Sequence, residues 1–319
     1  MAKAITDVAL IGLGAVGAAY LTSVADNFPE CRIRVVAAGE RAARLRAGGI
    51  VYNGRRYMFD VAEPQDGTPA GLLFVSVKNG QLAEAIEQAA AFVGPDTVII
   101  SPLNGVTSER KLAERFGAEK VVYSYAIKLD ATRRGSETVC GNEGWIVFGD
   151  EHNEPGRLSE NVIAVEEFFK RSHIEYEIPE DMIKSLWKKF MMNCGLNQTS
   201  AVLGFNYGLM QRSKEARSLM RSAMEEAAAA ARAAAGVELG EAEICEIFRT
   251  MDMLSPNGKT SMLQDVDARR VTEVDAFAET VVEIAREHGF AAPVNELYLR
   301  LIRAREESFQ LQDGNSSPR

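Results

Sequence analysis

The chain has 319 residues and a net charge of −9, and its 46% hydrophobic and 25% charged residues are typical of a folded globular protein. This length predicts two domains of the usual ~100–200 residues. An acidic chain lacks the basic surface that nonspecific nucleic-acid binding needs, so nucleic acid is not an expected partner. The four cysteines are far apart and only three histidines are present, so no metal site is expected.

The N-terminus resembles a signal peptide, because Lys3 precedes the apolar run 8–21. That run is shorter than the ~18–20 residues that span a bilayer, and its glycines weaken a helix. No other segment is long enough to span. We therefore expect a cytoplasmic protein that has no membrane partner.

Strand-like and helix-like patterns alternate in the first half of the chain. Apolar runs predict strands at 7–11, 32–39, 71–77, 97–103, 120–126, 145–149 and 173–178. Helical patterns occupy the segments 15–27, 40–47, 81–92 and 158–171. Such alternation predicts an α/β fold, a Rossmann-type doubly wound parallel sheet with helices on both faces.

After Pro179 the pattern is helical nearly throughout, including an alanine-rich stretch at 224–236. We therefore predict a Rossmann-type domain at 1–178, an all-helical domain at 179–310 and a flexible polar tail at 311–319. The alanine-rich stretch suits close helix packing, within one chain or between two, and a homodimer is the expected assembly.

The sequence GLGAVG directly follows the first strand and opens the first helix. In this context a G-x-G-x-x-G motif predicts dinucleotide binding, although a glycine-rich turn without a ligand is the alternative. The free N–H groups and positive end of the helix would attract the phosphates of NAD(P). The predicted contacts come from six consecutive residues: Gly12, Leu13, Gly14, Ala15, Val16 and Gly17.

The end of the second strand normally distinguishes NAD from NADP. An acidic residue there accepts a hydrogen bond from the ribose 2′-hydroxyl, whereas an arginine meets a 2′-phosphate. This chain offers both in succession, Glu40 and Arg41, with Arg44 one turn further on. The pattern alone therefore leaves the choice open.

A helix is predicted at LWKKFMMNCGLN, residues 186–197, with apolar residues on all sides. Lys189, Asn193 and Asn197 nevertheless share one stripe of it. A basic surface face is the simple explanation of Lys189 alone, but burying unpartnered amides costs roughly 2–7 kcal/mol each. The three side chains together therefore suggest a ligand site, in which the lysine would protonate a ketone oxygen that receives a hydride.

A second polar group lies in the segment 260–277, where Ser261 and Glu273 sit among packed apolar residues. The simple explanation of Glu273 is a salt bridge to a nearby arginine at the surface. That explanation weakens because a buried Lys189 needs a counter-charge.

These residues resemble the ketopantoate reductases (2-dehydropantoate 2-reductases), and the similarity extends over nearly the whole chain. The segments VKNGQ (77–81), LNGV (103–106), LWKKFMMNCGLN (186–197) and SMLQD with TEVD (261–275) carry it, besides the glycine loop. The resemblance implies that Lys78 and Gln81 approach the cofactor and that Asn104 lies beside the nicotinamide ribose and the catalytic lysine.

The resemblance also implies the roles of the helical residues. Lys189 would be the general acid, and Glu273 would bind a substrate hydroxyl or position Lys189. The implied substrate contacts are Asn193, Asn197 and Ser261.

Two positions depart from the family pattern. Ala38 stands where family members commonly carry the arginine for the NADPH 2′-phosphate, so either Arg41 replaces it or the protein prefers NAD; NADPH is the expected cofactor. Leu103 stands in place of the usual glutamine before the Asn-Gly pair, with no consequence derivable from the sequence.

The implied reaction is the NADPH-dependent reduction of 2-dehydropantoate to (R)-pantoate, a step of pantothenate and coenzyme A biosynthesis. The active site is expected in the cleft between the two domains. One alternative is a related NAD(P)-dependent dehydrogenase of another 2-oxo or 2-hydroxy acid, such as a mandelate-type substrate. A noncatalytic NAD(P) sensor is a further alternative, but a sensor has no use for a proton donor.

Overall fold

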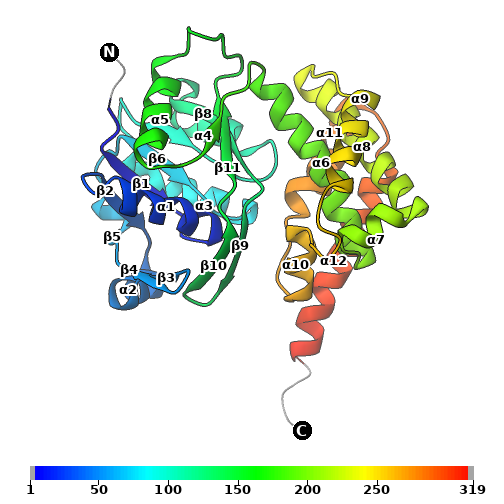
Figure 1. Cartoon of the computed structure of the whole chain (residues 1–319), viewed down its shortest axis with the longest axis horizontal. Helices are drawn as coiled ribbons and strands as arrows, with labels where there is room; N and C mark the ends of the chain where they lie inside the picture. The colour runs from blue at the N-terminus through cyan, green and yellow to red at the C-terminus, as the bar shows by residue number, and fades with distance from the viewer. Residues whose placement is uncertain (1–3, 315–319) are drawn as a thin grey trace. The chain divides into compact units, whose positions relative to one another are not determined.

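A computed structural model describes residues 4–314 of the chain. The chain divides into two compact units, Met1–Met182 and Ile183–Arg319 (Figure 1). The first unit is built on an eight-stranded sheet with the order β12-β11-β8-β7-β6-β1-β2-β5. Its strands are β1 (Asp7–Ile11), β2 (Arg32–Val36), β5 (Asp60–Ala62), β6 (Leu72–Val75), β7 (Val98–Ile100), β8 (Val121–Ile127), β11 (Trp145–Gly149) and β12 (Tyr176–Glu177).

The six strands from β5 to β8 in this order are parallel, which confirms the predicted fold class. Alternate residues of β1 enter two different cores: Leu10 packs with residues of α1 (Ala15–Asn27) and α5 (Glu160–Arg171), and Ile11 packs with residues of α3 (Leu82–Ala89) and α4 (Ser108–Phe116). Helices thus cover both faces of the sheet, as the near-continuous apolar strands require (Figure 1).

Two features of the first unit were not predicted. β11 runs antiparallel to β8, because the chain returns from β8 through a hairpin rather than a crossover helix. That hairpin, β9 (Asp130–Arg134) and β10 (Glu137–Asn142), joins β3 (Ile50–Tyr52) and β4 (Arg55–Tyr57) in a second sheet of order β4-β3-β10-β9. All four strands are short; β4, β9 and β10 are largely polar, and the apolar β3 is only three residues long.

The second unit is helical. Its helices are α6 (Met182–Leu203), α7 (Tyr207–Arg212), α8 (Lys214–Ala235), α9 (Glu241–Asp252), α10 (Ser261–Asp267), the π-helical turn η5 (Asp275–Glu279), α11 (Thr280–His288) and α12 (Pro293–Gly314). The alanine-rich stretch lies on α8, which packs against α11 and α12 of the same chain. At Gly195 a Cβ would lie 2.6 Å from the Met224 side chain, so this glycine lets α6 and α8 approach closely.

Helix α12 continues through Gly314, so residues 311–314 are helical rather than part of the expected flexible tail. Residues 315–319 lie outside the described residues. Among residues 4–314, no helix combines the length and apolar character needed to cross a membrane.

Candidate active site

The glycine loop leads from the end of β1 into α1. Gly12 has φ +99°, and a Cβ there would lie 2.2 Å from the Ser76 carbonyl oxygen at the end of β6. A Cβ on Gly17 would meet the Gly12 carbonyl oxygen at 2.6 Å. The Gly14 amide closes the turn by donating to the Gly12 oxygen at 2.7 Å. Internal packing alone therefore explains two of the three glycines.

Gly14 is different, because it has an ordinary extended conformation with φ −93° and the nearest atom to a Cβ would be 3.9 Å away. Nothing among residues 4–314 requires glycine at this position. The space that the missing side chain leaves is open, at the N-terminus of a helix with no side-chain cap and no acidic residue in its first turn. A loop of this shape fits a dinucleotide pyrophosphate, which needs close approach to backbone N–H groups.

The remaining residues of the motif surround this space. Ala15 and Val16 form the partly buried first turn of α1, whereas Leu13 is buried in the core. Ala15 and Val16 can present backbone N–H groups to a phosphate, and the Leu13 side chain anchors the loop.

The loops after β6 and β7 lie next to the glycine loop, since the parallel order β7-β6-β1 brings their carboxyl ends to one edge. Lys78 and Gln81 are exposed on the first of these loops, and partly buried Asn104 lies on the second. The Asn79 side chain donates to the Asn104 carbonyl oxygen at 2.7 Å and ties the two loops together. Asn79 was not singled out from the sequence, although it lies inside VKNGQ.

Leu103 now has a physical explanation. It is 5% exposed and packs in the core between the sheet and the helices α3 and α4. Gly105, with φ +103°, then turns the chain toward α4. The apolar side chain at position 103 therefore anchors the Asn104 loop to this core.

Beyond β2, Ala38 is the N-cap residue of α2 (Gly39–Gly48), and Arg41 lies exposed in the first turn of that helix. Because β2 pairs in parallel with β1, the start of α2 lies at the same sheet edge as the glycine loop. Arg41 is thus on the correct edge to meet a cofactor phosphate.

In the second unit, α6 carries three lysines with different surroundings. Lys184 pairs with Glu243 at 2.9 Å and Lys188 pairs with Glu246 at 2.6 Å, both carboxylates belonging to α9. These two lysines form a basic surface face, the arrangement that the sequence offered as the simple explanation of Lys189. Lys189 lies apart from them and is influenced by the charge of Glu273 instead.

Burial lowers the pKa of Lys189 to about 8, and the nearby Glu273 carboxylate offsets part of that change. Glu273 lies directly before Val274 and the π-helical turn η5, an irregularity that is frequent at functional sites. A lysine with this pKa remains protonated at neutral pH yet loses its proton more readily than an exposed one. Those are the properties of a general acid.

The predicted substrate contacts gather around Asn197. Its Nδ2 lies 3.5 Å from Asn193 Oδ1, one turn away on α6, and 3.5 Å from Ser261 Oγ at the start of α10. Asn193 is 2% exposed, whereas Ser261 is exposed. The structure therefore brings the two amides and the hydroxyl together, so they form a polar group suited to orienting a small polar molecule.

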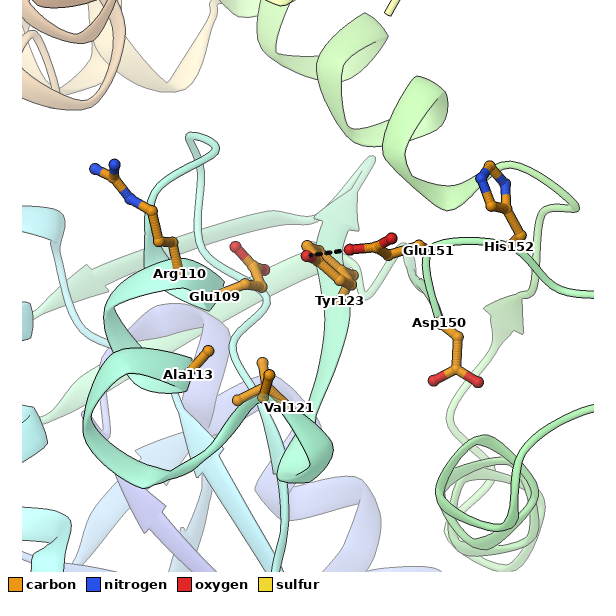
Figure 2. A pocket seen from close by; sticks show the side chains of 9 residues that line it. Glu109, Arg110, Ala113, Val121, Tyr123, Asp150, Glu151 and His152 are labelled. Atoms are coloured by element: carbon orange, nitrogen blue, oxygen red, sulfur yellow. Dashed lines mark hydrogen bonds between the residues drawn. The ribbon is translucent and has the colours of Figure 1, made fainter. Parts of the chain in front are cut away.

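A separate pocket of about 600 Å³ lies between α4, β8 and the loop after β11, and none of its lining residues is a predicted site residue. Figure 2 shows the Tyr123 hydroxyl directed at Glu151, to which it donates at 3.2 Å, with Glu109 nearby. Glu109 is almost fully buried, and burial raises its pKa to about 7. Ser108 and the Ser124 amide donate to its carboxyl group, which fits a structural role in anchoring α4 to β8.

A parallel sheet with a glycine loop after its first strand, together with a helical unit that carries a lysine near a carboxylate, has the features of a Rossmann-type oxidoreductase. Models of the ketopantoate reductase PanE/ApbA family match residues 8–153, and models of its C-terminal domain match residues 181–306. The chain belongs to the ketopantoate reductase family.

Individual relatives are distant. The 2-dehydropantoate 2-reductase of Aquifex aeolicus (strain VF5) is 26% identical, over 95% of this chain and 98% of the relative. D-mandelate dehydrogenase, solved with NADH and anilino(oxo)acetate, has a TM-score of 0.83 at 17% identity, covering 95% of this chain and 99% of its own. The dimeric ketopantoate reductase from Staphylococcus aureus has a TM-score of 0.76 at 20% identity, with the same coverage.

Proposed function

We propose that this protein reduces 2-dehydropantoate to (R)-pantoate with NADPH, and that Lys189 is the general acid. The observation that carries the proposal is the partly buried Lys189, which has a pKa of about 8 and lies near a carboxylate and a group of amides. The glycine loop and the open space at Gly14 support the binding of a dinucleotide to the first unit.

When bound, a reduced nicotinamide supplies a hydride to the carbonyl carbon of the 2-oxo acid. Negative charge then develops on the carbonyl oxygen, where the Lys189 ammonium stabilises it and donates a proton to give the hydroxyl group. Lys189 afterwards regains its proton from solvent. Glu273 favours the charged form of Lys189 between turnovers.

Two amides and a hydroxyl remain for orienting the substrate. We assign Asn193, Asn197 and Ser261 to hydrogen bonds with the polar groups of the 2-oxo acid, which fix the carbonyl relative to Lys189. We assign to Asn104 a contact with the nicotinamide ribose. We assign other contacts with the cofactor to Lys78, Gln81 and Arg41.

A second candidate substrate is a mandelate-type 2-oxo acid, because D-mandelate dehydrogenase shares this fold with a TM-score of 0.83. The relatives that match over nearly the full chain, including the one from Aquifex aeolicus, favour 2-dehydropantoate.

The test is an assay at about 340 nm of purified protein with each of NADPH and NADH and a panel of aliphatic and aromatic 2-oxo acids. We expect the highest kcat/KM with 2-dehydropantoate and NADPH. If kcat/KM for an aromatic 2-oxo acid exceeded that for 2-dehydropantoate by orders of magnitude, the proposed substrate would be wrong. If neither cofactor were oxidised with any of the acids, the reductase assignment would be overturned.

We also propose that the protein forms a homodimer, as the S. aureus relative does. Light scattering at micromolar concentration distinguishes a dimer from a chain of 34.9 kDa. A mass that stays at that value over the concentration range would contradict this proposal.

A further inference from the structure

The hairpin of β9 and β10 reaches the glycine loop, and Arg133 makes the contact. Its guanidinium donates to the carbonyl oxygen of Leu13 through Nη1 and to that of Gly135, at 2.9 Å, through Nε. Both strands of the hairpin also pack near α1. A cationic side chain from the second sheet is therefore fixed beside the loop that would receive the cofactor.

Two more arginines approach the same place from α2. Burial, followed by the positive charges of Arg41 and Arg44, holds the pKa of Arg133 below its usual value. Partial desolvation of the Arg41 guanidinium and the positive charge of Arg44 both lower the pKa of Arg41. Three guanidinium groups from two separate elements thus repel one another beside the glycine loop.

Within residues 4–314, no carboxylate lies within ion-pair distance of these three arginines. Other arginines of the same unit do have such partners: Arg34 with Asp7, Arg46 with Glu63 and Arg55 with Asp26. A cluster of unneutralised cations costs electrostatic energy, which a bound anion would recover.

The position of the cluster identifies the anion. In a Rossmann fold the end of β2 faces the adenosine ribose, and NADPH differs from NADH only by a phosphate on the 2′-oxygen. We propose that Arg133, together with Arg41 and Arg44, binds the 2′-phosphate of NADPH and so replaces an arginine at position 38, where this chain has Ala38. Arginine suits this task because its planar guanidinium can donate two parallel hydrogen bonds to a phosphate.

This inference rests on the proposed use of a nicotinamide dinucleotide. A contact of Arg133 with another part of the cofactor would affect the affinities for NADH and NADPH differently. If Arg133 bound the pyrophosphate instead, it would contribute equally to NADH and NADPH. The two possibilities are separated by ligands that share a 5′-phosphate and differ only at the 2′-position.

Isothermal titration calorimetry of the full chain with adenosine 2′,5′-bisphosphate and with adenosine 5′-monophosphate makes this comparison without any turnover. We expect the bisphosphate to bind more tightly. Arg133→Gln should weaken its binding by about tenfold to a hundredfold, the range for a lost hydrogen bond to a charged group, and should change monophosphate binding by less than about threefold.

Arg134→Gln is the matched control, since Arg134 is the exposed neighbour on the same strand, and it should leave both affinities unchanged. Arg41→Gln changes an exposed position on α2, so it should keep the fold and reproduce the selective loss if Arg133→Gln does not fold.

The inference would be overturned if Arg133→Gln weakened the binding of both ligands equally or left both affinities unchanged. It would also be overturned if the wild-type protein bound both ligands equally. If the wild-type protein prefers the bisphosphate and Arg133→Gln selectively abolishes that preference, but no 2-oxo acid is reduced, the inference stands and the proposed reductase function falls.

Discussion

The pKa of Lys189 predicts a pH dependence of catalysis that an exposed lysine would not give. With a pKa of about 8, about nine tenths of the free enzyme carries the ammonium at pH 7 but only about one tenth does at pH 9. Since kcat/KM reports ionisations of the free enzyme, it should fall about ninefold to tenfold over this interval. An unshifted lysine, with a pKa near 10.5, would lose only a few per cent of its protonated form.

Glu273→Gln makes this prediction specific. The Glu273 carboxylate raises the pKa of Lys189 against the effect of burial, so its removal should move the alkaline limb of the profile to lower pH. Lys188→Met is the control, because Lys188 pairs with Glu246 on α9 and should not affect the limb. The measurement is kcat/KM for 2-oxo acid reduction from about pH 6 to 10. A limb near pH 10.5 in the wild type, or one that Glu273→Gln leaves in place, would refute this reasoning.

Three further changes test other parts of the structure. Gly14→Ala adds a methyl group to open space, so it should cost less than about 1 kcal/mol of stability but weaken NADPH binding at least about tenfold; unchanged affinity in a fluorescence titration would show that the cofactor does not approach Gly14. The pKa of Glu109 is about 7 in the folded protein and about 4.5 in the unfolded chain. The free energy of unfolding should therefore fall by up to about 3 kcal/mol as the pH rises from about 4.5 to about 7. Glu109→Gln should lack this fall, and identical pH dependence of the two proteins in urea denaturation would contradict the burial of the charge. The Glu226 carboxylate accepts hydrogen bonds from the Val294 and Asn295 amides at 2.8 Å each, at the start of α12. Glu226→Ala should destabilise the protein by roughly 2–3 kcal/mol in thermal or urea unfolding, whereas the exposed Glu225→Ala should cost under about 0.5 kcal/mol; equal effects would remove α12 capping as the cause.

The parallel sheet could be predicted because its strands are buried on both faces and so appear as short apolar runs. The second sheet could not. β9 reads Asp-Ala-Thr-Arg-Arg and β4 reads Arg-Arg-Tyr, so neither has an apolar run, and both are defined by pairing with strands distant in sequence. The antiparallel direction of β11 depends on that same hairpin.

The candidate site residues on α6 could be proposed from the sequence because Lys189, Asn193 and Asn197 break the apolar pattern of their own helix. The residues that hold other site elements in place give no such local signal. Asn79 acts through a hydrogen bond to Asn104, 25 positions away, and Arg133 contacts Leu13, 120 positions away. Both contacts depend on the fold rather than on neighbouring residues, so only the structure could identify them.

The role of Lys189 as proton donor is tested most directly by Lys189→Ala, with single-turnover oxidation of NADPH measured after mixing with 2-dehydropantoate. We expect a rate at least about a hundredfold lower than in the wild type, with the dissociation constant for NADPH nearly unchanged. A rate equal to that of the wild type would contradict it.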